Sequence, residues 1–192
     1  FIADALTIRE NFGDVRGLTV VFMGDAKNNV ANSLMVGCAK LGMNYVACCP
    51  EADAPDSELV EKCRAIAAEN DCTVTVTSDV DEGTKGAHVI YTDIWVSMGE
   101  PASLWEQRIK ELSPYQVNTK VMANAADNAI FMHCLPAFHD AKTTVAQEIE
   151  EKFGLTEMEV TDEVFEGAQS RVFDEAENRM HSIKAVVLAT LR

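Results

Sequence analysis

Short apolar runs alternate with amphipathic helical patterns along this chain, and that alternation restricts its fold more than any other feature. Residues 18–23 are apolar apart from Thr19 and end at Gly24, as expected of a strand that is buried on both faces. Residues 28–41 then place apolar side chains at helical spacing and stop at Gly42, a typical helix C-terminal signal. The sequence has thus specified one strand, one helix and one turn.

The same unit recurs through the rest of the chain. Further strands are predicted at 45–50, 72–76, 87–91 and 129–132, and further helices at 57–70, 79–85 and 103–112. Strands that alternate with helices in this way form a parallel sheet through right-handed crossovers. We therefore predict an α/β fold, a doubly wound, five-stranded parallel sheet with helices on both faces (a Rossmann-like three-layer sandwich).

Composition narrows the class of protein. The 192 residues are 47% hydrophobic and 24% charged, which is ordinary for one soluble globular domain without an internal boundary. A formal net charge of −15 repels phosphate backbones, so nucleic acid is not an expected partner. Apolar stretches are too short to span a membrane. The six cysteines lie mostly in predicted strands and helices, and without a Cys-x-x-Cys pair they suggest reduced thiols, a cytoplasmic setting and no metal site.

The first strand-to-helix turn, residues 24–29, argues against a dinucleotide cofactor. A dinucleotide fold carries a Gly-x-Gly-x-x-Gly segment there, so that pyrophosphate can approach the backbone, whereas this turn holds one glycine, Gly24. No nicotinamide or flavin cofactor is predicted. Asn28 and Asn29 offer amide groups to a small zwitterion, but Asn28 by itself is best interpreted as a helix N-cap.

Two polar segments directly follow predicted strands. One begins at Asp93 and continues into Ser97-Met98-Gly99, and the other contains Cys134. Ligands bind beyond the carboxyl ends of the strands in open α/β sheets, so we expect Asp93 and Cys134 to converge in one crevice. The alternatives are that Asp93 caps a turn, that Cys134 is an inert buried thiol, or that Cys134 is the nucleophile of a Cys-His hydrolase.

The ends of the chain are helical in pattern. Residues 169–191 repeat apolar side chains at three- and four-residue steps, and 185–189 are apolar nearly all round, more than one sheet face requires. This helix is expected to pack on a missing partner. Arg179, if it points into the crevice, suits a phosphate. Because the chain opens at Phe1 without an initiator Met, we expect it to be cut from a longer protein.

Four motifs, in this order, carry a family resemblance. They are Gly24-Asp25-Ala26-Lys27-Asn28-Asn29, Asp93-x-x-x-Ser97-Met98-Gly99, His133-Cys134-Leu135-Pro136, and Asp162-Glu163-Val164-Phe165 with Glu177-Asn178-Arg179-Met180-His181. Through them essentially the whole chain resembles the ornithine-binding, carboxyl-terminal domain of the ornithine carbamoyltransferases. That family makes L-citrulline and phosphate from carbamoyl phosphate and L-ornithine, without a cofactor.

The resemblance implies a role for each matching residue. Asp93 and Cys134 are the implied catalytic residues, as candidates to accept the proton of the ornithine side-chain amine. The implied ornithine site comprises Asn29, Asp93, Ser97 and Met98. The implied carbamoyl phosphate site comprises Cys134, Leu135 and Arg179.

The family also has an amino-terminal domain, with a Ser-Thr-Arg-Thr-Arg phosphate loop, that has no counterpart here. Residues 1–192 are therefore expected to be the ornithine-binding domain alone, inactive by itself, with 1–12 and about 170–192 as interdomain helices. Family trimers form mainly through the absent domain, so a homotrimer or higher oligomer is expected of the full-length parent. Two alternatives stay open: a carbamoyltransferase for another amine or amino acid, and a non-catalytic amino-acid-binding module.

Overall fold

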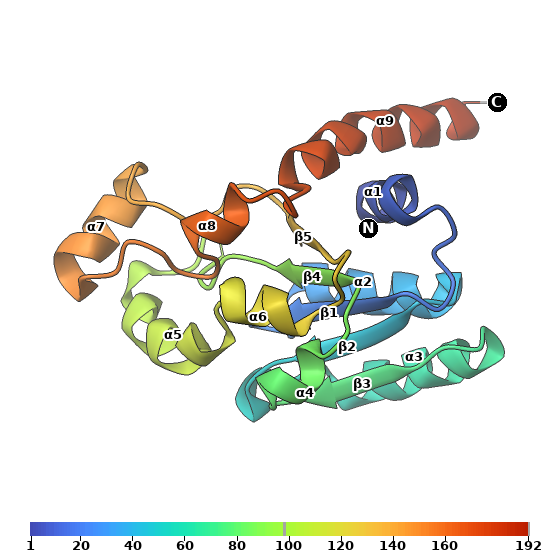
Figure 1. The fold of residues 1–192 in the computed structure, drawn as a ribbon, viewed down its shortest axis with the longest axis horizontal. Helices are drawn as coiled ribbons and strands as arrows, with labels where there is room; N and C mark the ends of the chain where they lie inside the picture. Colours follow the sequence, from blue (N-terminus) through green and yellow to red (C-terminus); the bar gives the residue numbers. More distant parts are fainter. Residues whose placement is uncertain (98, 192) are drawn as a thin grey trace.

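The computed structural model describes residues 1–97 and 99–191, and its centre is a sheet of five parallel strands in the order β3-β2-β1-β4-β5 (Figure 1). The strand bounds are β1 Thr19–Met23, β2 Asn44–Cys48, β3 Val74–Thr77, β4 Val89–Thr92 and β5 Ile130–His133. The predicted five-stranded parallel sheet is confirmed. Strand β1 is paired with β2 on one side and with β4 on the other, so the winding of the sheet reverses between β1 and β4.

Helices connect successive strands and flank the sheet. They are α1 Ile2–Phe12, α2 Asn29–Leu41, α3 Ser57–Glu69, α4 Val80–Thr84, α5 Trp105–Leu112, α6 Thr119–Asn124, α7 Thr144–Phe153, α8 Asp162–Phe165 and α9 Val172–Thr190, with 3-10 turns η1 Glu51–Asp53, η2 Ala102–Leu104 and η3 Ser113–Tyr115. Helix α2 shows how local sequence sets such bounds. The Asn28 side chain accepts a hydrogen bond from the Ala31 N–H, and Gly42 takes the left-handed conformation (φ 75°) that ends the helix.

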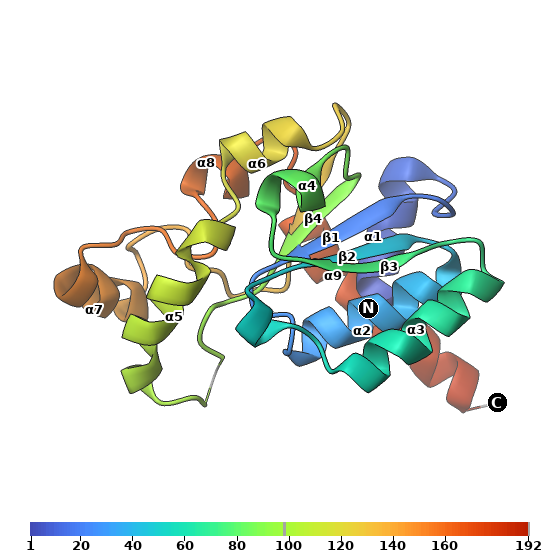
Figure 2. The ribbon, with the colours of Figure 1, turned by 90° about the horizontal axis from the view of Figure 1, so that it is seen from below.

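The sheet separates two apolar layers because alternate residues of each strand face opposite ways. Phe22 packs with Leu34 of α2 on the face covered by α1, α2 and α3, whereas Val21 packs with Phe131 and Val164 on the face of α4, α6 and α8 (Figure 2). The predicted three-layer sandwich is therefore confirmed. Each fully buried side chain of this size stabilises the fold by about 1.5–3 kcal/mol.

A third apolar cluster lies beside the sheet, at the left of Figure 1, where α5 and α7 pack together. It joins Trp95, from the segment after β4, to Trp105 of α5 and Ile149 of α7. The segment that leaves β4 is therefore supported by its own small core on both sides of residues 97–104.

Most element boundaries differ from the predicted ones by one or two residues. The strand predicted at 72–76 begins at Val74, because the Cys72 N–H still donates to the Ala67 carbonyl at the end of α3. The predicted tail helix begins at Val172 rather than 169. The pattern did not predict α6 and α8, which have 6 and 4 residues.

Helices α1 and α9, at opposite ends of the chain, lie side by side at the edge of the molecule (Figure 1). The C-terminal half of α9 exposes large apolar side chains, namely Met180, Ile183, Val186, Val187, Leu188 and, just beyond the helix, Leu191. Within the described residues, no helix has both the length and the hydropathy needed to cross a membrane.

Candidate active site

Asp93 and Cys134 lie together at the carboxyl edge of the sheet, as the sequence predicted. Asp93 follows β4, Cys134 follows β5, and the Cys134 thiol donates a hydrogen bond to Asp93 Oδ1 with a sulfur–oxygen distance of 3.4 Å. The Ile94 N–H donates to the same oxygen at 2.8 Å. The two strand ends are thus joined through one carboxyl group.

Asn28 adds the first strand-to-helix turn to this cluster. Its Oδ1 accepts the Ala31 N–H at 2.8 Å, which leaves the amide nitrogen to donate to Asp93 Oδ2 at 3.3 Å. The N-cap interpretation of Asn28 is confirmed, and the cap also orients the amide towards Asp93. The cluster therefore spans the point between β1 and β4 where the sheet reverses, the usual ligand position in such folds.

Burial shifts the ionisation of both groups. It raises the pKa of Asp93 above its ordinary value, against the opposing effects of His133 and of the hydrogen bonds from the Ile94 N–H and the Cys134 thiol. Burial, reinforced by the Asp93 charge, also strongly raises the pKa of the Cys134 thiol. A thiol that donates to a carboxylate stays protonated at neutral pH, so Cys134 is a hydrogen-bond donor here and not a thiolate nucleophile.

His133 is fully buried, and both of its ring nitrogens face oxygen acceptors. Nδ1 lies 2.7 Å from the Cys134 carbonyl oxygen, and Nε2 lies 3.3 Å from Glu159 Oε1, an ion-pair distance without hydrogen-bond alignment. Burial disfavours the imidazolium, but Glu159 outweighs it, so the pKa of His133 is raised. The ring therefore braces the backbone turn at Cys134.

This geometry bears on two other kinds of site. His133 cannot serve as the base of a Cys-His hydrolase, because its nitrogens engage the Cys134 carbonyl and Glu159 rather than the thiol. The ligand atoms of Asp93, His133 and Cys134 lie within 4.8 Å of one another, a donor set that can hold a metal ion. In this structure the same atoms are already committed to the hydrogen-bonding cluster, which gives no reason to assign a metal.

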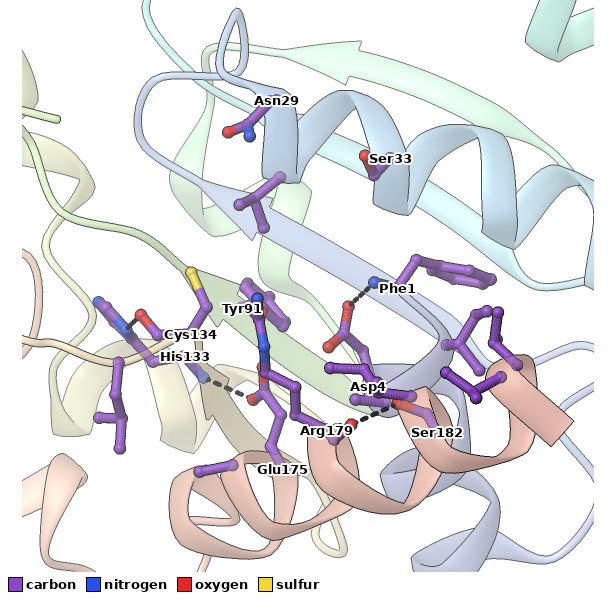
Figure 3. Close-up of a pocket in the computed structure, with 18 residues that line it drawn as sticks. Phe1, Asp4, Asn29, Ser33, Tyr91, His133, Cys134, Glu175, Arg179 and Ser182 are labelled. Carbon is purple, nitrogen blue, oxygen red and sulfur yellow. Dashed lines mark hydrogen bonds and ion pairs between the residues drawn. The ribbon is translucent and has the colours of Figure 1, made fainter. Parts of the chain in front are cut away.

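A cavity of about 540 Å³ opens beside the cluster, between the strand ends, the N-terminus of α2 and the pair α1–α9 (Figure 3). Four of the predicted site residues line it: Asn29, Cys134, Leu135 and Arg179. Arg179 extends from α9 into the cavity, as the phosphate hypothesis required of it. The cavity therefore combines amide, thiol and guanidinium groups.

Ser97 lies away from the described lining of this cavity. Ser97 is exposed, its backbone N–H donates to Glu100 Oε2 at 2.7 Å, and it is not among the described residues that line the cavity. Met98 lies outside the described residues. Their predicted contact with ornithine stays a prediction.

The sequence did not lead us to two buried carboxyl groups near the cavity, Glu159 and Glu175. Glu159 pairs with His133, and Glu175 of α9 accepts the Tyr91 hydroxyl at 2.7 Å and the His133 backbone N–H at 3.1 Å. A signal for Glu175 was present. Val172, Glu175, Asn178 and Ser182 recur at helical spacing and form the buried side of α9. Glu159 lies outside the helices and strands and had no such signal.

Comparison with known proteins gives a consistent result. The family model described as "Aspartate/ornithine carbamoyltransferase, Asp/Orn binding domain" matches residues 16–190. The catabolic ornithine carbamoyltransferase of Treponema denticola is 63% identical over 99% of this chain, and that of Lentilactobacillus hilgardii is 54% identical over 99%. The solved ornithine carbamoyltransferase of Pyrococcus furiosus is 40% identical over 96% of the chain, with a TM-score of 0.82.

The chain matches only about half the length of these relatives. The chain spans 56% of each of the two curated relatives and 53% of the Pyrococcus furiosus structure.

Proposed function

The chain belongs to the aspartate/ornithine carbamoyltransferase family, and on that premise we propose that it is the ornithine-binding half of an enzyme that transfers the carbamoyl group of carbamoyl phosphate to the side-chain amine of L-ornithine. The products are L-citrulline and phosphate. The observation that carries the proposal is the hydrogen-bonded cluster of Asn28, Asp93 and Cys134. Cys134 also lines the cavity that Arg179 enters, and Asp93 lies behind it, bonded to its thiol.

The proposed residues divide between the two substrates. Asn29 and Asp93 offer an amide and a carboxylate to the amino-acid end of ornithine, and the segment of Ser97 and Met98 closes over it. Cys134 and the Leu135 carbonyl lie beside the carbamoyl group, and Arg179 pairs with phosphate oxygens through its planar guanidinium.

The reaction requires a neutral amine. The amine nitrogen attacks the carbamoyl carbon, the bond from that carbon to the phosphate oxygen breaks, and the nitrogen loses a proton. Asp93 is the proposed proton acceptor, since burial raises the pKa of its carboxyl group. Cys134, held as a thiol by Asp93, orients that carboxylate. Holding both substrates in line supplies much of the acceleration, and Arg179 stabilises the departing phosphate.

The rest of the active site is proposed to come from the half of the family sequence that this chain does not match. Helix α1 and residues of about 170–192 would bridge the two halves, with the exposed apolar side of α9 covered by the other half. In this proposal residues 1–192 are one domain, inactive alone, and the complete protein is a homotrimer or higher oligomer. Six unpaired cysteine thiols support a cytoplasmic location.

Two experiments test the proposal. In an NMR titration of the 192-residue chain, L-ornithine should shift the amides of Asn29, Asp93 and Cys134, whereas putrescine, which lacks the amino-acid end, should not. Asp93→Asn should weaken that response, with Glu58→Gln, on the exposed side of α3, as the matched control. Mixing the chain with a separately expressed amino-terminal half of a family member should restore citrulline formation from carbamoyl phosphate, and Arg179→Gln should lower it.

The outcomes separate the alternatives. An equal response to putrescine would favour a carbamoyltransferase for another amine. Ornithine binding without reconstituted turnover would favour a non-catalytic amino-acid-binding module. Turnover by the chain alone would contradict the proposal that it is one half of the enzyme.

A further inference from the structure

Glu175 contacts the two strands whose ends carry the site. One oxygen of its side chain accepts the hydroxyl of Tyr91, two residues before Asp93, and the other accepts the backbone N–H of His133, one residue before Cys134 (Figure 3). Both contacts are buried, and Glu175 itself is 4% exposed. A single side chain therefore ties β4 and β5 to α9.

Arg179 lies one helical turn beyond Glu175. Residues four apart share a face of a helix, and both residues line the same cavity as Cys134. Fixing Glu175 against the strands therefore fixes the height and rotation of the turn that carries Arg179. Arg179 is exposed and α9 exposes much of its own apolar surface, so this polar contact restrains the helix where apolar packing does not.

The surroundings of Glu175 are acidic. Asp4 of α1 is also buried, and burial together with the Asp4 charge raises the pKa of Glu175 to about 8. The carboxyl group is therefore mostly protonated at neutral pH and adds little charge to the cavity. Its contribution to an anion site is geometric rather than electrostatic.

We propose that Glu175 is a positioning residue, which holds α9 against the ends of β4 and β5 so that Arg179 faces an anionic group bound beside Cys134. The inference depends on the proposed function only for naming that group as the phosphate of carbamoyl phosphate. It concerns a residue with no part in the reaction itself.

The test uses Cys134 as a reporter in the 192-residue chain. Cys134 is the partly exposed thiol and the other five cysteines are buried, so it should react with disulfide reagents before them, through the small fraction of thiolate that its raised pKa leaves. The rate with the dianion 5,5′-dithiobis(2-nitrobenzoate) is divided by the rate with neutral 4,4′-dithiodipyridine. The same Cys134 thiolate attacks both reagents, so the ratio of the two rates does not depend on how much thiolate is present. The ratio instead reports the electrostatic potential that Arg179 produces at the thiol. Cys134→Ser should remove the fast phase.

We expect the variants to change the ratio of the two rates by different amounts. Arg179→Gln should lower the ratio about five-fold, since a positive charge near the thiol is lost. Glu175→Ala should lower it about three-fold by freeing Arg179. Glu175→Gln should stay within about 1.5-fold of the unsubstituted chain, because an amide can accept from the His133 N–H and donate to the Tyr91 oxygen. Glu177→Gln, on the exposed side of the same helix, is the matched control and should not lower the ratio.

The direction in which Glu175→Ala changes the ratio of the two rates tests the proposal. If Glu175 acted only through its charge, removing it would raise the ratio, and if it were only structural, the ratio would not change; either outcome overturns the proposal. Should Glu175→Ala fail to fold, Tyr91→Phe removes one of the two contacts and should lower the ratio about two-fold. None of these rates depends on ornithine or on turnover, so failure here leaves the proposed function standing.

Discussion

Helices α2 and α9 differ in which side chains they bury. Helix α2 buries Leu34 and Met35 completely, whereas α9 buries the polar Glu175 and Asn178 and leaves Leu188 60% exposed. Both helices are long, and both lie near the cavity. The difference shows that α2 is packed on its apolar side and that α9 leaves much of its apolar surface exposed in this chain.

The two arrangements have different energetic consequences. Apolar burial of the kind seen in α2 stabilises the fold by about 25 cal/mol per Å² of apolar surface removed from water. The buried contacts of α9 are hydrogen bonds, such as those of Asn178 to Thr7 (3.0 Å) and Glu10 (2.6 Å). Each adds about 1 kcal/mol when made and costs more when one partner is lost. Polar contacts of this kind fix the position of a helix more than they stabilise it.

The comparison is tested most strongly by shortening one apolar side chain on each helix. Leu34→Ala should lower the free energy of unfolding by about 2–5 kcal/mol, because it leaves a cavity in a closed core. Leu188→Ala removes the same atoms from an exposed position and should change it by less than about 0.5 kcal/mol. Urea unfolding under one set of conditions measures both. Equal losses would show that α9 packs within this chain after all.

The next effect concerns pH. Burial raises the pKa of Glu175 to about 8, so between the ordinary value near 4.5 and 8 the unfolded chain has released this proton while the folded chain retains it. Stability should therefore fall as pH rises through that range, by at most about 1.4 kcal/mol per unit. Glu175→Gln removes this contribution. Melting temperatures of the two chains between pH 5 and 8.5 should converge at the acid end, and parallel curves would contradict the assignment.

A smaller effect is expected at the start of α2. Asn28→Ala removes the cap and should cost about 1 kcal/mol, whereas Asn28→Ser keeps a cap oxygen and should cost less than about 0.5 kcal/mol. Neither variant keeps the amide that donates to Asp93. Both should therefore weaken the NMR response to ornithine to a similar extent although their stabilities differ. If the NMR response to ornithine instead weakened in proportion to the loss of stability, Asn28 would act only as a helix cap.

The smallest change in stability is expected on the exposed side of α9. Leu188→Ser should leave the free energy of unfolding within about 0.5 kcal/mol of its starting value, but should reduce binding of 1-anilinonaphthalene-8-sulfonate and any self-association seen by sedimentation. The exposed Glu177→Gln serves as the control on the same helix. Unchanged dye binding would show that this surface is not the apolar patch that the comparison assumes.

The sheet was predictable because its strands are short apolar runs followed by turn residues, a pattern that depends on local sequence. The convergence of Asp93 and Cys134 was predictable for a related reason: parallel strands end at one edge. Local pattern also gave the cap at Asn28. It did not give the hydrogen bond from Asn28 to Asp93, which joins residues 65 positions apart.

Helix α9 shows where pattern reasoning fails. Its apolar spacing, which includes Met180 and Val187, predicted the helix correctly, but those residues are exposed and the buried side is polar. Periodicity identifies a helix without saying which of its faces other elements cover. Glu175 and Glu159 were missed because the role of a buried carboxyl group depends on partners that are distant in the sequence. These partners are the Tyr91 hydroxyl for Glu175 and the His133 ring for Glu159.

The strand order has a consequence for how the site is assembled. Strands β1, β2 and β3 lie on one side of the reversal and β4 and β5 on the other, so the sheet divides between residues 1–77 and the remainder of the chain. Asn28 belongs to the first part, and Asp93 and Cys134 belong to the second. A chain cut at Ser78, in the connection that follows β3, would consequently lose the cavity in each piece and recover it only when the two pieces associate through β1 and β4.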